Sequence, residues 1–451
     1  MEDIKRQEKF RRMTEEPVEK LVLSMAAPAI VSMLVTSIYN MADTFFVGRL
    51  GTSATAAVGV VFPVMAIIQA FGFFFGHGSG NYISRALGKK EVEKAERMAI
   101  TSFILSLLAG LLITVVGFAF EKGLLWLLGS TDTIYPYAKS YLTVILIGAP
   151  WMCSSFVLNN QLRFQGNATY AMIGISTGGL LNIALDPLFI FAFKMGIAGA
   201  AWATILSQLV SFILLYIGTL RSDNLKLKLK KFTPNWYYIK NISIGGVPSL
   251  CRQGLNSLAT VCLNFACRGY GDAAIAAMSV VTRIMMFATS ALIGFGQGFQ
   301  PVCGFNYGAG KYKRVRKAYI FCAISGFCFL LCVAVAAILT APFIISLFRD
   351  DPEVISIGAK ALRWQCIVFP FNAVVIMSNM LFQTIGKMGR ASLLAMSRQG
   401  LFFIPLVLLL PRFFELNGIM LSQPGADLFS LILAIPLTVV MLRELKTDEI
   451  E

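Results

Sequence analysis

Charged residues are scarce in this chain of 451 residues. Asp, Glu, Lys and Arg together make up 14% of it, whereas a typical soluble protein has about 25%. Hydrophobic residues make up 57% of the chain, and the mean hydropathy is +0.71. This composition excludes an ordinary soluble domain and predicts an integral membrane protein.

The chain also lacks the sequence motifs of common enzymes. It has one histidine, no GxxxxGK[ST] phosphate loop, no serine-nucleophile motif and no CxxC pair. Its nine cysteines lie mostly inside apolar runs, which is typical of small buried apolar residues rather than of disulfides or metal ligands. We therefore expect no ATP coupling, no enzyme chemistry and no cofactor.

Apolar runs of about 20 residues or more recur along the chain and are separated by short polar joints. This pattern favours helical spans over the alternating residues of an outer-membrane barrel. The segment 1–20 is charged and has no apolar core, so we interpret it as a retained cytoplasmic tail. We count twelve spans, at about residues 21–48, 54–83, 95–119, 136–158, 170–193, 197–220, 240–267, 273–305, 315–341, 357–383, 391–414 and 418–442.

Lys and Arg are distributed unevenly between the loops on the two sides of the expected spans. One set holds isolated cations such as Arg49, Lys122 and Lys194, whereas the other holds clusters such as those in 85–97 and 311–317. Because cations favour cytoplasmic loops, this asymmetry predicts that both termini are cytoplasmic. The net charge of +15 is therefore interpreted as a signal of orientation and not of nucleic-acid binding.

The two halves of the chain are similar to each other. When the chain is aligned with itself so that Pro28 falls on Pro248, the same shift later aligns Asn159 with Asn379. Each half holds six expected spans, so equivalent spans run in the same direction. The predicted fold is an all-α integral membrane protein with twelve transmembrane helices, arranged in two six-helix lobes related by a pseudo-two-fold axis along the membrane normal.

Two such lobes facing each other across a cleft are a common design of alternating-access carriers. The expected division of the chain is a cytoplasmic tail at 1–20, an N-lobe at 21–220, a cytoplasmic basic linker at 221–238, a C-lobe at 239–443 and a cytoplasmic C-terminal tail at 444–451.

Two carboxylates lie inside the expected spans of the first half. Asp43 in the first span, Asp186 in the fifth and Thr204 in the sixth fall at similar depths, in the outer third of the bilayer. Tyr39 precedes Asp43 by four residues, and Asn182 precedes Asp186 by four, so each pair shares a helix face. Two acids in one apolar pocket disfavour double ionisation, which suits an exchangeable proton. The alternative is a structural polar network that locks three helices together.

Several segments resemble the multidrug and toxic compound extrusion (MATE) family, and within it the bacterial DinF and MepA-like branch. They are NMADTFFVGRLG (40–51), SRALGKK (84–90), LRFQGNATYA (162–171), NIALDPLFIF (182–191), GIAGAAWAT (196–204), QTIGKMGRA (383–391) and GIMLSQPGADL (418–428). The resemblance implies two lobes around a V-shaped cavity in a bacterial cytoplasmic membrane, and export of organic cations in exchange for H+ or Na+. It also implies a coupling site at Tyr39, Asp43, Asn182, Asp186 and Thr204.

The second half does not repeat these acids. The alignment of the two halves places Leu263 opposite Asp43 and Leu406 opposite Asp186. This departure from relatives with acids in the C-lobe favours a proton pathway in the N-lobe. Na+ at Asp43, Asn182, Asp186 and Thr204 remains an alternative, and no other metal site is expected.

Aromatic, amide and methionine side chains of the spans can line an adaptable cavity for flat hydrophobic cations. The candidates are Phe62, Met65, Met172, Asn256, Met285 and Met286. We expect a monomer whose partners are small organic cations and the lipid bilayer.

Further charges inside the expected spans require partners or water. We expect Asp427 to neutralise one of Arg252, Arg283 and Arg398, and the sole histidine, His77, either relays protons or is simply packed. The arginines also leave open a lipid-linked precursor flippase, whose cavity would be more basic. An intramembrane enzyme or receptor would need a clustered acid motif or an appended soluble domain.

Overall fold

The computed structural model describes residues 2–222 and 225–447, and all regular structure within them is helical. The first half contains α1 (Glu2–Glu15), α2 (Val18–Gly48), α3 (Thr52–Gly88), α4 (Val92–Ala119), α5 (Glu121–Leu127), α6 (Tyr135–Phe164), α7 (Ala168–Pro187), η1 (Leu188–Ala192) and α8 (Gly196–Leu220). After the short turn η2 (Leu229–Lys231), the second half contains α9 (Trp236–Cys267), η3 (Arg268–Tyr270), α10 (Asp272–Gly308), α11 (Tyr312–Ser346), α12 (Pro352–Val368), η4 (Phe369–Phe371), α13 (Asn372–Ile385), α14 (Met388–Met396), η5 (Ser397–Phe403), α15 (Ile404–Leu409) and α16 (Pro411–Thr447).

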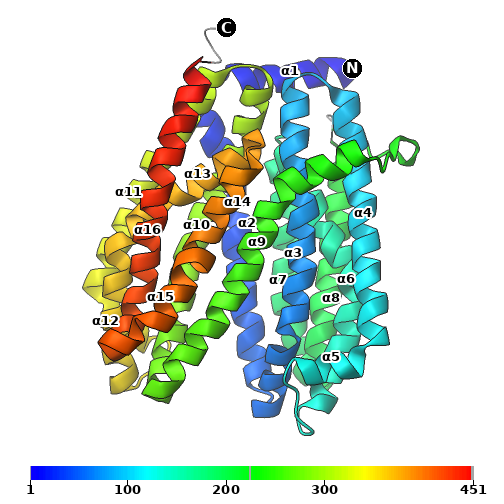
Figure 1. Ribbon diagram of the computed structural model, residues 1–451. Helices are drawn as coiled ribbons and strands as arrows, with labels where there is room; N and C mark the ends of the chain where they lie inside the picture. The colour runs from blue at the N-terminus through cyan, green and yellow to red at the C-terminus, as the bar shows by residue number, and fades with distance from the viewer. Residues whose placement is uncertain (1, 223–224, 448–451) are drawn as a thin grey trace.

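Eleven helical segments in the described residues are long and apolar enough to cross a membrane. The twelfth expected span is α9, which has 32 residues and runs beside α3 through the bundle (Figure 1). Its mean hydropathy is lower than that of the other eleven segments because it contains polar and charged residues, namely Lys240, Asn241, Arg252, Gln253 and Asn256. The all-helical twelve-span fold is confirmed, and the least apolar span is a helix that meets the other half of the chain.

Three spans that were expected to be continuous helices are interrupted. The fifth changes from α-helix to the π-helical turn η1 directly after Pro187, and the tenth is broken by η4 at Pro370. Proline has no N–H to donate and clashes with the preceding turn, which weakens the regular ladder at these two points. The expected eleventh span, 391–414, instead ends at Leu409, and α16 begins at Pro411 with a kink at Glu415, where φ is 51°.

The long helices form two groups. α2, α3, α4, α6, α7 and α8 pack together, and α9 to α16 pack together, while α2 contacts α10 and α3 contacts α9 between the groups. In Figure 1 the first group is blue to green and the second is green to red. We call these groups the N-lobe and the C-lobe.

The lobes are in direct backbone contact near one end of the bundle. A Cβ atom on Gly78 of α3 would lie 2.3 Å from the carbonyl oxygen of Ile242 in α9, and one on Gly298 of α10 would lie 2.4 Å from Cα of Ala26 in α2. Both distances are too short for a side chain. Glycine is therefore required for this approach, and we call this end of the bundle the closed end.

Towards the other end, the contacts between lobes stop. Ser37 Oγ donates to Ser290 Oγ at 2.9 Å between α2 and α10, and Gln253 Nε2 donates to Gln69 Oε1 at 2.6 Å between α9 and α3. Beyond these two pairs, the described residues form no hydrogen bond or ion pair from lobe to lobe. The two pairs form the floor of a cleft, and we call the opposite end the open end.

Residues beyond the floor confirm this opening by their exposure. Side chains three, four and seven residues further along a helix share the face of the floor residue. On that face Met41 of α2 is 42% exposed, Phe62 of α3 is 57% exposed and Met286 of α10 is 57% exposed. The cleft is therefore lined by both lobes from its floor to the open end.

The helix α1 covers the closed end, where α16 also ends (Figure 1). Its buried Met13 accepts a hydrogen bond from Asn306 Nδ2 of the C-lobe at 2.9 Å, and Thr14 accepts one from Lys311 Nζ at 3.0 Å. Lys9 Nζ donates to Asn167 Oδ1 of the N-lobe. The segment interpreted as a tail is thus helical and contacts both lobes.

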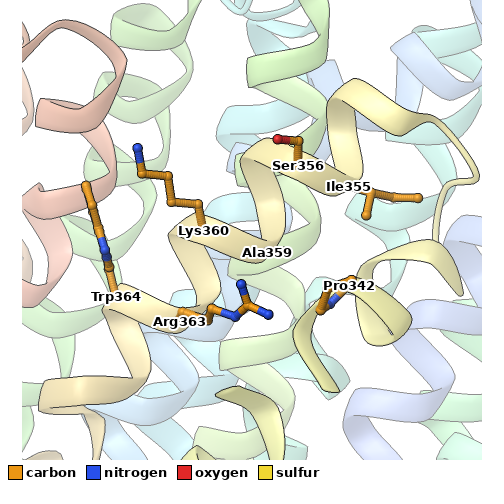
Figure 2. Close-up of a pocket in the computed structure, with 7 residues that line it drawn as sticks. All are labelled: Pro342, Ile355, Ser356, Ala359, Lys360, Arg363 and Trp364. Atoms are coloured by element: carbon orange, nitrogen blue, oxygen red, sulfur yellow. The ribbon is translucent and has the colours of Figure 1, made fainter. Parts of the chain in front are cut away.

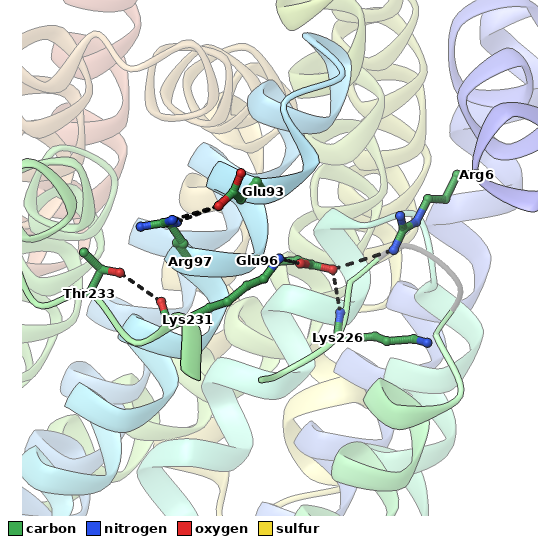
Figure 3. Close-up of polar contacts among 7 residues, drawn as sticks. All are labelled: Arg6, Glu93, Glu96, Arg97, Lys226, Lys231 and Thr233. Carbon is green, nitrogen blue, oxygen red and sulfur yellow. Dashed lines mark hydrogen bonds and ion pairs between the residues drawn. The ribbon is translucent and has the colours of Figure 1, made fainter. Parts of the chain in front are cut away.

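The linker between the lobes is anchored at the same end (Figure 3). Glu96 of α4 is only 5% exposed and accepts from the backbone N–H of Lys226 at 3.4 Å and from Lys231 Nζ. Its carboxylate also lies 3.6 Å from the guanidinium of Arg6 in α1. One buried acid therefore holds α1, the linker and α4 together.

Candidate functional site

The two N-lobe acids come from different helices and lie at one site. Asp43 is in the last two turns of α2, and Asp186 is the penultimate residue of α7 and fully buried. They are close enough for their charges to interact. Asn182 Nδ2 donates to Asp186 Oδ1 at 3.4 Å, as expected for residues four apart on one helix.

The remaining residues of the predicted set lie around the acids. Tyr39 packs against Gly179, where a Cβ atom would come within 3.1 Å of the tyrosine ring. Thr204 in α8 is 7% exposed and donates to the carbonyl of Ala200 at 3.0 Å. The glycine at position 179 allows α2 to approach α7 closely.

Three buried acceptor atoms at this site have no hydrogen-bond partner among the residues that the structure describes: Asp43 Oδ1, Asn182 Oδ1 and Asp186 Oδ2. Buried carboxylate oxygens without donors are costly unless a proton or a cation satisfies them. Carboxylate, amide and hydroxyl oxygens are also the ligand atoms that hard cations prefer. The arrangement can thus hold either a shared proton or a small cation such as Na+.

Tyr141 of α6 belongs to this site and was not predicted. It is fully buried and lies beside Thr204, within electrostatic range of both acids. Its hydroxyl also donates to Met65 Sδ at 3.7 Å, which connects the site to a residue on the cleft side of α3. Nothing in the sequence distinguishes Tyr141 from other span tyrosines, because its role arises only from the packing of α6 on α3 and α8.

The proposed cavity residues divide into two groups in the structure. Phe62, Asn256 and Met286 are exposed along the cleft, and Met65 lies half-buried between the cleft and Tyr141. Met285 instead packs against the C-lobe core, and Met172 lies in α7 ten residues before Asn182, towards the closed end. The structure therefore brings four of the six residues to the cleft.

Two charges inside the C-lobe, Arg398 and Asp427, pair with each other. Arg398 Nε donates to Asp427 Oδ1 at 2.7 Å, which confirms that Asp427 neutralises an arginine and identifies which one. Asn372 Nδ2 and Gln423 Nε2 also donate to Asp427, each at 2.8 Å. With three donors on its carboxylate, Asp427 forms a satisfied structural network, unlike the N-lobe acids.

His77 lies on the closed-end side of the floor, and Arg252 lies at the level of the floor, next to Gln253. His77 is 3% exposed, stacks on Phe73 with ring centroids 5.2 Å apart, and its Nδ1 lies 2.9 Å from Ser249 Oγ of the C-lobe. Arg252 Nη1 donates to Asn379 Oδ1 at 3.4 Å. These contacts give His77 a packed position between the lobes.

Two surface hollows lie away from this site. One, of about 480 Å³, is formed by α11 and α12 and is lined by Lys360, Arg363 and Trp364 (Figure 2). The other lies on α6 and α8. Neither includes any of the site residues.

Two helical lobes that meet at one end and leave a cleft between them at the other are typical of a membrane transporter. The sequence profile of the MATE (MatE) family matches this chain twice, over residues 28–188 and 248–409. The chain belongs to the MATE family. The two matches begin at Pro28 and Pro248, the same two positions that the internal repeat aligns.

Named relatives cover nearly the whole chain. The multidrug export protein MepA of Staphylococcus aureus is 27% identical over 434 residues, which are 95% of each chain. MepA of Staphylococcus haemolyticus is 25% identical over 96% of each. The MepA-like resemblance seen in the motifs is thereby confirmed.

Solved structures agree in fold. An outward-facing multidrug resistance MATE transporter of the MOP superfamily superposes with a TM-score of 0.92 at 27% identity, covering 97% of this chain and 98% of that one. A MATE protein in the straight conformation gives the same TM-score, identity and coverage.

Proposed function

We propose that this protein exports hydrophobic organic cations across the bacterial cytoplasmic membrane in exchange for protons. The observation that carries the proposal is the pair of N-lobe acids with unpartnered buried oxygens, Asp43 Oδ1 and Asp186 Oδ2. Similarity to MepA, a multidrug export protein, supports drugs as the exported class.

The closed end is proposed to face the cytoplasm and the open end the outside. The clusters of Lys and Arg that follow α3, α8 and α10 lie at the closed end, as do α1 and the linker. Cations are enriched on the cytoplasmic side of membrane proteins. The structure then represents the outward-open state of the cycle, with the N-lobe, the linker and the C-lobe at residues 21–220, 221–238 and 239–443.

The proposed exchange follows from the charge of the acid pair. When a proton is shared by Asp43 and Asp186, the site carries one negative charge and can close around Tyr39 and Tyr141 with that proton in a hydrogen bond between the acids. When the proton leaves, the site carries two negative charges and attracts a cation more strongly. A ligand shifts the equilibrium between two conformations only when it binds one of them more tightly than the other. The proton and the substrate must therefore each favour a different conformation of the carrier.

Transport must cross the floor of the cleft. The glycine contacts at Gly78 and Gly298 have to open while the cleft closes above Ser37 and Ser290. The N-lobe has a core of its own, whereas the core of the C-lobe also includes residues of the N-lobe helices at the closed end, such as Leu21, Ile83 and Met98. Movement of the lobes as units therefore requires these closed-end contacts to separate. One chain contains both lobes and the complete acid site, which is the basis for proposing that a monomer is active.

The coupling ion is tested in liposomes that contain the purified protein. An imposed pH gradient is expected to drive ethidium movement at equal Na+ on both sides, and a Na+ gradient at equal pH is expected to have no effect. The control is protein-free liposomes under the same gradients. Movement driven only by the Na+ gradient would replace H+ with Na+ in the proposal.

A further inference from the structure

The hollow between α11 and α12 carries two cations (Figure 2). Lys360 and Arg363 line it and are exposed, whereas Gln365 on the opposite face of α12 is buried. Figure 2 shows Arg363 directed towards Pro342 of α11 and Lys360 extended beside Trp364. The Lys360 ammonium lies 5.0 Å from the centre of the Trp364 ring. Both charges therefore lie on the outer face of α12, where a ligand can reach them.

This face of the C-lobe is turned towards lipid and not towards the cleft. In the C-lobe the floor of the cleft is formed by α9 and α10, whereas the hollow lies on α11 and α12. Large apolar side chains near the hollow are exposed: Leu339 of α11 by 74%, Phe343 of α11 by 64%, and Ile367, one turn beyond Arg363, by 64%. Exposed apolar side chains on a membrane span are positioned to contact acyl chains.

The two cations are within reach of the lipid headgroups. α12 begins at Pro352 at the open end, so Lys360 and Arg363 lie about 12 and 16 Å along it. The headgroup region adds about 5 to 8 Å to each side of the hydrocarbon core, and long cationic side chains extend outwards to it. Trp364 is of the residue type that is enriched at this boundary. Glu353, which is on the same face of α12, lies about 10 Å further out than Lys360 and does not line the hollow.

The contacts of both cations within the protein hold them in place without neutralising them. Arg363 Nε donates to the carbonyl oxygen of Ile338 at 3.2 Å. Pro342 has no N–H for that carbonyl, so the guanidinium replaces the missing helical donor. Lys360 Nζ donates to Asn417 Oδ1 at 2.8 Å. Within residues 2–222 and 225–447 no acid forms an ion pair with either side chain, so the terminal guanidinium nitrogens and the ammonium can bind an anion.

The equivalent hollow of the N-lobe, on α6 and α8, is built differently. There the Nζ of Lys139 lies 3.9 Å from the carboxylate of Glu121, and Thr143 donates to that carboxylate at 2.7 Å. The internal repeat places Arg363 opposite Thr143 and Ala341 opposite Glu121. The hollow itself therefore comes from the repeated fold, whereas only the C-lobe copy has a second cation and an alanine in place of the acid.

We propose that the hollow on α11 and α12 binds the headgroup of an anionic phospholipid from the leaflet at the open end. Arg363 and Lys360 bind the phosphate, the hydroxyl of Ser356 donates to the headgroup, and the acyl chains lie along Leu339 and Ile367. A guanidinium binds a phosphate through two parallel hydrogen bonds, and the ammonium adds a second charge. Phosphatidylcholine binds more weakly because its own cation lies next to these charges. The site lies outside the cleft, so it is independent of the transported substrate and the coupling ion.

Native mass spectrometry of the purified full-length protein tests this site, because it resolves the number of lipids bound. Dioleoylphosphatidylglycerol or dioleoylphosphatidylcholine is added to lipid-depleted protein in detergent. The Lys360→Gln, Arg363→Gln variant is expected to carry one phosphatidylglycerol fewer than the unmodified protein, with an affinity about tenfold lower at that site, and to bind phosphatidylcholine as before. Arg363→Lys, which keeps the charge, is expected to retain this lipid. Lys139→Gln, in the N-lobe hollow, is the matched control and is expected to change nothing.

Equal numbers of phosphatidylglycerol on the unmodified protein and the double variant would overturn the inference, as would an equal loss from the Lys139→Gln control. An equal loss of phosphatidylcholine would show that the site does not select an anionic headgroup, and would also overturn it. Soluble glycerol phosphate at the lipid concentration separates a lipid site from a site for free phosphate. It is expected not to displace the lipid, and displacement would contradict the assignment to a phospholipid. Unchanged phosphatidylcholine binding also reports that the double variant is folded.

Discussion

Asp43→Asn and Asp186→Asn are each expected to reduce ethidium movement driven by a pH gradient by at least about tenfold. Asparagine has nearly the shape of aspartate, so the helices can still pack, but it cannot take up or release a proton. Each substitution leaves one acid that no longer shares its proton with a second carboxylate. The measurement is the initial rate of ethidium fluorescence change in proteoliposomes.

Asp132→Asn is the matched control for these two variants. Asp132 lies exposed in the loop before α6 and contacts none of the site residues. Its substitution is expected to leave the rate unchanged. Full activity of both Asp43→Asn and Asp186→Asn, in protein of normal thermal stability, would show that the acids are a structural network and not the coupling site.

A covalent link across the floor of the cleft is expected to stop transport. Ser37 Oγ and Ser290 Oγ are 2.9 Å apart, so cysteines at both positions should form a disulfide on oxidation. The link holds α2 and α10 together. The closed end of the bundle then cannot open while the open end closes. Oxidation should reduce proton-driven ethidium movement to the level of protein-free liposomes, and a reductant should restore it.

A disulfide inside one lobe is the control for this experiment. Ser397 Oγ and Ser430 Oγ lie 3.2 Å apart within the C-lobe, so the corresponding cysteine pair should form without affecting transport. All variants carry serine in place of the exposed Cys328 and Cys332, which prevents unrelated crosslinks. Normal transport by the oxidised Ser37→Cys, Ser290→Cys protein would show that the lobes do not separate at this floor.

The fold was largely predictable because its determinants are periodic in the sequence. Hydropathy gives the number of spans, and a constant shift that places Pro28 on Pro248 gives the duplication. The seventh span was also counted from the sequence, although the polar residues of α9 lower its hydropathy below that of the other spans. The exact end of the eleventh span was missed, since Pro411 and the kink at Glu415 end one helix and start the next within a few residues.

The site was predictable in part. Spacing by four residues places Asn182 and Asp186 on one face, and equal depth indicates that Asp43 can reach them. The contribution of Tyr141 and the choice of Arg398 as the partner of Asp427 depend on how helices are rotated against each other. Span hydropathy carries no information about that rotation, so these contacts required the structure.

The central claim is that two adjacent acids exchange a proton for a cationic substrate, and proton release on binding tests it most directly. Ethidium is added to the purified protein in weakly buffered solution near neutral pH, and the pH change is recorded with a soluble indicator. The account predicts release of protons with saturable binding, and no release from the Asp43→Asn, Asp186→Asn double variant. Saturable ethidium binding to the unmodified protein without any proton release would contradict it.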